Sequence, residues 1–294
     1  MGSPLLLLLI CFTVTSYNDR IEGAKQIDNS NVDTHSNRRL SVLLAGDSLV
    51  EQGVNPRRGG WVSLLQYRYT GSTEVLSRGL SGYNTRWFLK YVMPDLKDEV
   101  KRGAYSPALI VVWLGTNDAA LVNGSNQEMH VPVEDYAKNL VEIVTKFQAA
   151  APDAKILLIT PPHVDDDARV EYAATRNDSK RGLVDRSNAE AGRYALACTE
   201  AASNAGVPVF DLYSYFNAMP APTRNALLQD GIHFNTAGNQ LVDEQFRSKI
   251  RTEFPALVAN MESLQFPAAS KWVAEDPYTP VNTVTSQASS RLLL

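Results

Sequence analysis

The sequence predicts an α/β protein with a flavodoxin-like, three-layer α/β/α sandwich around a five-stranded parallel sheet. Three observations predict this class. Short apolar runs alternate with amphipathic stretches along the chain. The runs are almost continuously apolar, as strands buried on both faces are. The chain has 294 residues, 44% of them hydrophobic, which suits one well-buried domain. We expect this domain to span residues 40–276.

The strands are expected at five apolar runs. These are Leu40–Ala45, Glu74–Leu76, Ala108–Leu114, Lys155–Thr160 and Val207–Asp211. Parallel sheets of this type bind ligands at the carboxyl ends of their strands. The residues that directly follow each run are therefore the candidates for a site.

Helices are expected where apolar residues recur every three or four positions. One begins after Pro132, with the apolar positions Tyr136, Leu140, Ile143, Val144 and Phe147. Another begins after Thr236, with the apolar positions Leu241, Val242, Phe246 and Ile250. The segment from Pro161 to Arg186 is long, charged and weakly periodic, so we expect a loop or a small cap beside the ligand edge.

The two ends of the chain differ from this domain. Residues 1–16 resemble a secretory signal peptide, because the apolar run Leu5–Val14 is followed by polar residues. The run is shorter than the roughly 20 residues of a membrane span, so no transmembrane segment is expected. Residues 17–39 are expected to be a flexible lead-in and residues 277–294 a disordered tail.

The leader favours a secreted or secretory-pathway protein over the cytoplasmic alternative. Sequons at Asn123 and Asn177 would then be candidate glycosylation positions. Cleavage after residue 16 would remove Cys11 and leave Cys198 without an intrachain partner, so the fold does not depend on disulfides. Cys198 lies on the apolar face of an Ala-rich helix, which favours a core cysteine over a nucleophile.

Charge excludes one class of partner. The formal net charge is −4, and no Lys/Arg cluster is interleaved with aromatic residues. Nucleic-acid surfaces need such a basic stripe. Nucleic acid is therefore not expected as a partner.

The first strand candidate leads directly into Gly46-Asp47-Ser48-Leu49. The glycine permits a sharp turn, which places Ser48 at the ligand edge and at the start of a helix. There its hydroxyl can attack a carbonyl and its backbone N–H can bind an anion. The alternative is that Ser48 only caps the helix. We interpret Asp47 as a support for the turn.

A serine nucleophile needs a base, and the chain offers four histidines. His35 lies in the lead-in, His130 is expected to be a solvated loop residue, and His163 could line the site without acting as the base. His233 follows Asp230 by three residues across a glycine turn, so the carboxylate can orient the imidazole. This spacing is common in turns, so by itself it has low specificity.

Two further strand ends carry hydrogen-bond donors. The segment Gly115–Asp118 follows the third strand candidate, where the Asn117 amide could donate to an oxyanion. The segment Arg78–Asn84 follows the second, and its glycines allow an exposed backbone N–H. Each segment also has a plain structural interpretation as a turn or a helix cap.

In chain order, these four segments resemble the four blocks of the GDSL/SGNH hydrolase family. The blocks are GDSL at 46–49, RGLSGYNTRW at 78–87, GTND at 115–118 and DGIH at 230–233. The resemblance covers about residues 40–254. The second block and Gly59-Gly60-Trp61 are most similar to the isoamyl acetate-hydrolysing esterase branch.

The resemblance implies the SGNH hydrolase fold and assigns roles to site residues. It implies a catalytic triad of Ser48, Asp230 and His233. It also implies an oxyanion hole made by the backbone N–H groups of Ser48 and Gly82 with the Asn117 amide. Gly82 is preferred to Gly79 because it follows serine in the family's Ser-Gly pair.

The expected activity is hydrolysis of short-chain, acetyl-type carboxylic esters through an acyl-enzyme, without a cofactor. Alternatives within the fold are a carbohydrate acetylesterase, whose partner would be a carbohydrate ester, and a lipase. A non-enzymatic alternative is a binding module with a blocked site. The acidic run Asp165–Asp167 is interpreted as a solvated loop, because no His or Glu at ligand spacing accompanies it, and no metal is expected.

Overall fold

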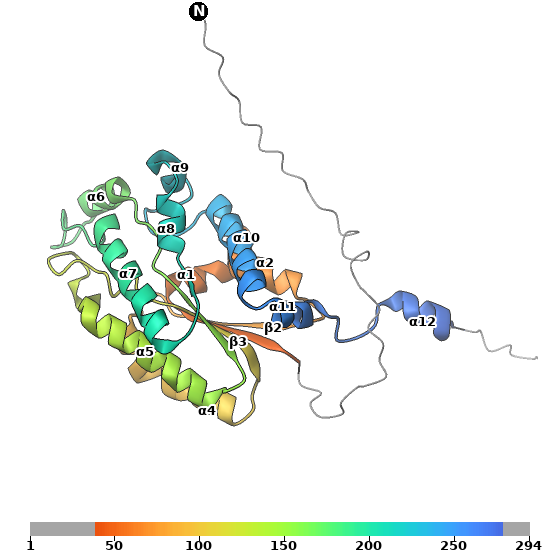
Figure 1. The fold of residues 1–294 in the computed structure, drawn as a ribbon. Coiled ribbons are helices and arrows are strands. Elements are labelled where there is room, and N and C mark those ends of the chain that lie inside the picture. Colours follow the sequence, from red (N-terminus) through yellow and green to blue (C-terminus); the bar gives the residue numbers. More distant parts are fainter. Residues whose placement is uncertain (1–38, 279–294) are drawn as a thin grey trace, which may run out of the picture. The chain divides into compact units, whose positions relative to one another are not determined.

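The computed structural model describes residues 39–278. Within them, five strands form one parallel sheet with the order β2-β1-β3-β4-β5 (Figure 1). The strands are β1 (Ser41–Gly46), β2 (Glu74–Gly79), β3 (Pro107–Trp113), β4 (Lys155–Ile159) and β5 (Val209–Phe210). This is the flavodoxin-like order, so the predicted fold class is confirmed.

The α-helices connect the strands or follow β5. They are α1 (Ser48–Glu51), α2 (Trp61–Arg68), α3 (Thr85–Trp87), α4 (Met93–Lys101), α5 (Val133–Ala150), α6 (Asp166–Thr175), α7 (Asn188–Ala205), α8 (Leu212–Asn217), α9 (Ala221–Asn225), α10 (Thr236–Glu253), α11 (Pro255–Glu262) and α12 (Ala269–Glu275). Short 3₁₀ turns are η2 (Gln52–Val54), η3 (Pro56–Arg58) and η5 (Gln127–Met129), and η4 (Phe88–Val92) is a π-helical turn.

The sheet is buried on both faces because helices cover both, and alternate side chains of each strand enter the two cores. Leu44 and Val111 lie in a core shared with α2, α10 and α11. Leu43 and Ile110, one position away, lie in a second core shared with α4, α5 and α7. Figure 1 shows these two groups of helices on either side of the strands.

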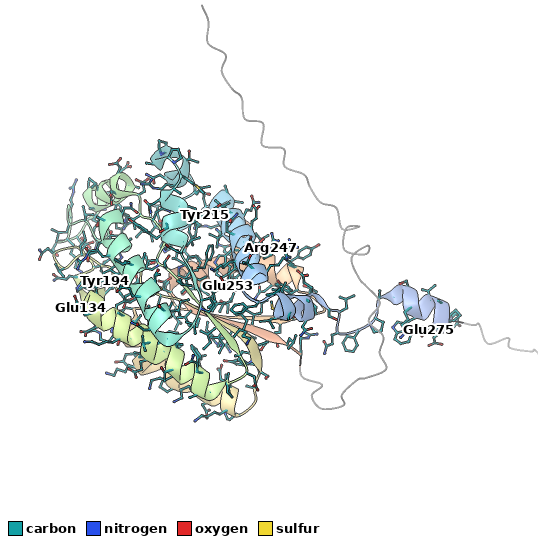
Figure 2. The ribbon with its side chains drawn as sticks, in the orientation of Figure 1. Glu134, Tyr194, Tyr215, Arg247, Glu253 and Glu275 are labelled. Carbon is teal, nitrogen blue, oxygen red and sulfur yellow. The ribbon has the colours of Figure 1, made fainter. Side chains whose placement is uncertain are left out.

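Helices α5 and α7 form much of the second layer, as their apolar spacing predicts. Tyr194 of α7, labelled in Figure 2, packs against Tyr136 of α5 with ring centroids 5.1 Å apart. Its hydroxyl donates to the backbone carbonyl of Val131, which precedes α5. Cys198 is buried on the same helix, which agrees with the predicted core cysteine.

The strand boundaries differ from the expected runs at the two edges of the sheet. β2 continues to Gly79, since Ser77 and Arg78 pair with β1 although their side chains are polar. β5 has only two residues, and Asp211 instead caps α8 by accepting from the Ser214 backbone N–H at 3.0 Å. Edge strands are half-exposed, so hydrophobicity marks their ends poorly.

Residues 161–186 contain a helix that the sequence did not predict. The Asp165 carboxylate caps α6 by accepting from the Ala168 backbone N–H at 3.3 Å. The acidic run is thus the start of a helix, a position that favours negative charge, and not a loop. Only Arg169 and Ala173 are buried on α6, which explains the weak periodicity.

The expectations for the chain ends are mostly outside the described residues. The leader at 1–16, nearly all of the lead-in and most of the tail fall there, and these boundaries stay predictions. Between residues 39 and 278, no helix combines the length and the apolar character needed to cross a membrane.

Candidate active site

The end of β1 is held between its two neighbouring strands. The Asp47 backbone N–H donates to Trp113 at the end of β3, and the Leu80 N–H donates to Gly46 (3.3 and 3.0 Å). A Cβ on Gly46 would lie 2.6 Å from the Trp113 carbonyl oxygen, so only glycine fits this close approach. The packing therefore fixes where the next residues, Asp47 and Ser48, lie.

Asp47 supports the turn into α1. Its buried carboxylate accepts from the Leu49 backbone N–H at 2.9 Å. Burial raises the pKa of this carboxyl to about 6. The contact caps the short helix that starts with Ser48, in agreement with the interpretation from sequence.

Ser48, His233 and Asp230 form one chain of hydrogen bonds. Ser48 Oγ lies 2.8 Å from His233 Nε2, and His233 Nδ1 lies 2.7 Å from Asp230 Oδ2. A carboxylate only accepts, so Nδ1 carries the proton and Nε2 is left as the acceptor for the serine hydroxyl. The structure thus brings together three residues that are up to 185 positions apart.

The Asp230 carboxylate is held in its charged form. Burial acts to raise its pKa, but the hydrogen bonds and charge of His233 outweigh burial and lower the pKa to about 2. Asp230 Oδ1 also accepts from the backbone N–H groups of Ile232 and His233 (3.0 and 2.8 Å). The charge is therefore present at neutral pH to orient the imidazole.

The turn that carries Asp230 and His233 is held by α6. Asp165 N–H donates to the Gly231 carbonyl, and Arg169 Nη1 donates to the Asp230 carbonyl (both 2.9 Å). Gly231 has a φ of +87°, a conformation that favours glycine. The predicted small cap thus lies directly beside the candidate site.

The three expected oxyanion donors follow neighbouring strands of the sheet, β2, β1 and β3. Asn117, in the turn beyond the end of β3, donates from Nδ2 to the Tyr83 carbonyl at 2.9 Å, in the turn that contains Gly82. Gly82 has a φ of +81°. Within residues 39–278, no hydrogen bond engages the backbone N–H of Ser48 or Gly82. These N–H groups are available to an oxygen of a ligand.

The other described histidines lie in different surroundings. His163 is fully buried against Phe216 (ring centroids 4.7 Å apart), so it offers no surface to a substrate. Burial lowers the pKa of His163 to about 4. His130 is partly buried and donates from Nδ1 to the Ala120 carbonyl at 2.7 Å. His130 is thus a loop residue, as expected, but it is only partly exposed to solvent.

Two buried charged residues beside the site were missed by sequence reasoning. Arg186 donates to Asn117 Oδ1 at 2.8 Å. The Asp118 carboxylate accepts from the Thr85 backbone N–H at 3.0 Å, and burial raises its pKa to about 7. The GTND block contains Asp118 and offered a signal for it. Arg186 had none, because it ends a charged, weakly periodic segment.

The parallel sheet with helices on both sides is the SGNH hydrolase fold. The model of the GDSL-like Lipase/Acylhydrolase family matches residues 44–241, and the chain belongs to this family. It is therefore an enzyme of the esterase/lipase class that acts on carboxylic ester bonds.

Proteins similar in sequence to this chain include members of the same family. A GDSL esterase/lipase of Arabidopsis thaliana is 36% identical over 73% of this chain and 87% of the relative. The isoamyl acetate-hydrolyzing esterase 1 homolog of Mus musculus is 33% identical over 68% of this chain and 77% of the relative. The resemblance to that branch is thus confirmed.

A solved structure supports the fold. The acetyl xylan esterase AlAXEase superimposes with a TM-score of 0.55 at 19% identity, covering 71% of this chain and 99% of that chain. At this identity the likeness shows the fold and not the substrate.

Proposed function

We propose that the protein hydrolyses short-chain, acetyl-type carboxylic esters, with Ser48 as nucleophile, His233 as general base and Asp230 as the residue that orients His233. The observation that carries the proposal is the continuous hydrogen-bonded chain from Ser48 Oγ through the imidazole to the Asp230 carboxylate. This is the arrangement that activates a serine hydroxyl.

The acylation step starts with proton transfer. His233 Nε2 accepts the proton of Ser48 while Oγ attacks the ester carbonyl carbon. The negative charge moves to the carbonyl oxygen, where the N–H groups of Ser48 and Gly82 and Nδ2 of Asn117 stabilise it. The carbonyl then re-forms, the carbon–oxygen bond to the alcohol breaks, and His233 gives its proton to the departing alcohol oxygen.

The deacylation step repeats this chemistry with water. His233 removes a proton from a water molecule, whose oxygen attacks the acyl carbon bound to Ser48. The same donors hold the oxyanion until the bond to Ser48 Oγ breaks and the serine recovers its proton. The products are a carboxylic acid and a regenerated enzyme, so no cofactor is required.

The substrate class is supported by sequence relatives. The relatives named isoamyl acetate-hydrolyzing esterase are 28–34% identical to this chain in mammals and fission yeast. Their name describes an acetyl ester of a small alcohol. We extend that class to this protein as part of the proposal.

The first test is a panel of p-nitrophenyl esters from acetate to palmitate, with Ser48→Ala in parallel. We expect the fastest turnover on the shortest acyl chains and its loss in Ser48→Ala. The matched control is Ser203→Ala, an exposed serine on α7, which should keep full activity. A long-chain optimum would indicate a lipase, and no turnover on any ester would indicate a binding module.

One observation favours a carbohydrate acetylesterase as a second candidate. A depression of about 560 Å³ beside Asp230 is lined by Gln52, Asn55, Arg58, Gln229 and Asp230. Amide and guanidinium groups suit hydroxyl-rich alcohols better than alkyl ones. Faster release of acetate from acetylated xylooligosaccharides than from isoamyl acetate would support this candidate, and the reverse order would exclude it.

We also propose that the protein enters the secretory pathway, on the basis of the apolar run Leu5–Val14. Asn123 and Asn177 are both exposed, as glycosylation requires. Expression in a eukaryotic host tests this. A secreted protein whose N-terminus starts near residue 17 would support the proposal, and retention of Met1 in the cell extract would contradict it.

A further inference from the structure

We infer that Arg186 is a positioning residue of the oxyanion hole, because it holds the Asn117 amide in the orientation that presents Nδ2 to the substrate carbonyl. The inference deepens the proposed function and rests on it. Arg186 takes no part in the acylation and deacylation steps, yet it is only 3% exposed to solvent. A buried guanidinium is costly unless it is fully paired, so its contacts are informative.

One guanidinium contacts two consecutive residues at the end of β3. Arg186 Nε donates to the Thr116 backbone carbonyl at 2.6 Å, and Nη2 donates to Asn117 Oδ1 at 2.8 Å. The planar guanidinium has its N–H groups in a fixed geometry. It therefore ties the Asn117 side chain to the backbone of its own strand end.

The partners of the Asn117 amide decide which way it faces. The two ends of an amide have nearly the same shape, but a guanidinium only donates and a carbonyl only accepts. Arg186 therefore requires Oδ1 on its side, and the Tyr83 carbonyl requires Nδ2 on the other. Nδ2 has two hydrogens, and the one not given to Tyr83 remains for the substrate oxygen.

The charge of Arg186 also strengthens this donor. A positive group at Oδ1 draws electron density from the amide, which makes the Nδ2 hydrogens more positive. Both Arg186 and Asn117 are buried, so water screens the effect little. The same contact thus orients Asn117 and increases its stabilisation of a developing oxyanion.

A second arginine connects Arg186 to the opposite side of the site. Arg186 Nη1 donates to the Asp185 backbone carbonyl at 3.1 Å, and the Asp185 carboxylate accepts two bonds from Arg169 Nη2 (2.8 and 2.9 Å). Arg169 Nη1 reaches the Asp230 carbonyl at 2.9 Å. One buried network therefore touches the proposed oxyanion donor at one end and the turn of His233 at the other.

The test is a double-mutant cycle on p-nitrophenyl acetate with Arg186→Gln and Asn117→Ala. We expect Arg186→Gln to lower kcat by about tenfold to a hundredfold with KM within about twofold, as for loss of an interaction made in the transition state. In the Asn117→Ala background the same substitution should change kcat by less than about twofold, because its target is gone. Equal losses in both backgrounds would overturn the inference.

Arg169→Gln is the matched control. It removes a guanidinium from the Asp185 carboxylate, which Arg186 Nη1 also approaches at 3.6 Å, but Arg169 does not contact Asn117. Arg169→Gln can lower kcat by loosening the Asp230 turn. We expect the same fold loss in the wild-type background and in the Asn117→Ala background. If Arg186→Gln acted only by disrupting the buried charges, both arginine substitutions would show the same change in fold loss of kcat between the two backgrounds. That result would also overturn the inference.

Arg186→Lys keeps the experiment decisive if Arg186→Gln does not fold. Lysine retains the buried charge beside Asp185 but loses the planar fork. We expect a smaller loss of kcat that again disappears in the Asn117→Ala background, and a loss that persists there would contradict the inference. Failure of the proposed function looks different, because Ser48→Ala and Asn117→Ala would then leave turnover unchanged.

Discussion

The two halves of the candidate site differ in how deeply they are buried. Ser48 and Asn117 lie just beyond the ends of the central strands β1 and β3 and are buried. Asp230 and His233 are partly exposed, on a turn that receives hydrogen bonds from the start of α6. The difference teaches that the nucleophile is fixed at the buried edge of the sheet, whereas the base lies on a more accessible turn that hydrogen bonds and the core packing of Phe234 hold together.

The largest expected effect would test whether the two halves act as one unit. We expect Ser48→Ala and His233→Ala each to lower kcat/KM by about 10⁵-fold to 10⁶-fold, and the double variant to lose no more, since members of a triad are not additive. The kinetics of the three variants check this. A double variant with the product of the two single losses would mean that the halves work independently.

The next largest expected effect comes from the turn that carries Asp230 and His233. Asp230→Asn keeps the shape of the side chain but not the charge that fixes the imidazole tautomer, so we expect kcat to fall by about 10⁴-fold. Asp167→Asn makes the same chemical change at an exposed carboxylate of α6 and should be neutral. Steady-state rates with a short ester measure both. A loss of less than about tenfold in Asp230→Asn would remove Asp230 from the triad.

A smaller effect is expected at the strand end. Asn117→Ala removes one oxyanion donor, and we expect kcat to fall by about 10²-fold to 10³-fold with little change in KM. Asn123→Ala, at an exposed position in the following loop, serves as the control. A rise in KM at constant kcat would instead assign Asn117 to binding of the ground state.

The smallest expected effect is on the pH dependence of stability, where the carboxyls of Asp230 and Asp118 differ. The pKa of Asp230 is lowered to about 2, whereas burial raises that of Asp118 to about 7. The raised pKa of Asp118 means that its contribution to stability is fully present below about pH 4 and is lost as pH rises to about 7. The slope is at most about 1.4 kcal/mol per pH unit. In Asp118→Asn the side chain does not titrate, so this loss of stability with rising pH is absent.

Thermal unfolding of the wild type and Asp118→Asn between pH 4 and pH 8 measures this difference. The melting temperature of the variant relative to the wild type should rise with pH up to about pH 7 and then stay constant. A constant difference across the range would show that Asp118 keeps an ordinary pKa in the folded state.

The sheet and the candidate site could be predicted because their signals are local. The central strands β1 and β3 are continuous apolar runs, and each site residue follows a strand or a glycine turn within a few positions. Parallel strands bring their carboxyl ends to one edge, so four separate segments predicted one site. The residues made Ser48 and Asn117 candidates, and the family resemblance chose these roles over a plain cap or turn and selected Gly82.

What the sequence did not reveal depends on contacts between distant residues. Arg186 meets Asn117 across 69 positions, and His130 meets Ala120 across a folded loop. Helix α6 was missed because most of its surface faces solvent, so hydrophobic periodicity was absent. These features are decided by tertiary packing and not by local pattern.

The loop after α6 has a practical use for engineering. Asn177, Asp178 and Ser179 are all exposed at its tip, and space around Gly182 is open. Exposed polar tips of this kind accept inserted peptides. A reporter inserted at Ser179 would follow α6, whose Arg169 donates to the Asp230 carbonyl, so spectroscopy of the reporter would test whether this segment changes when a substrate binds.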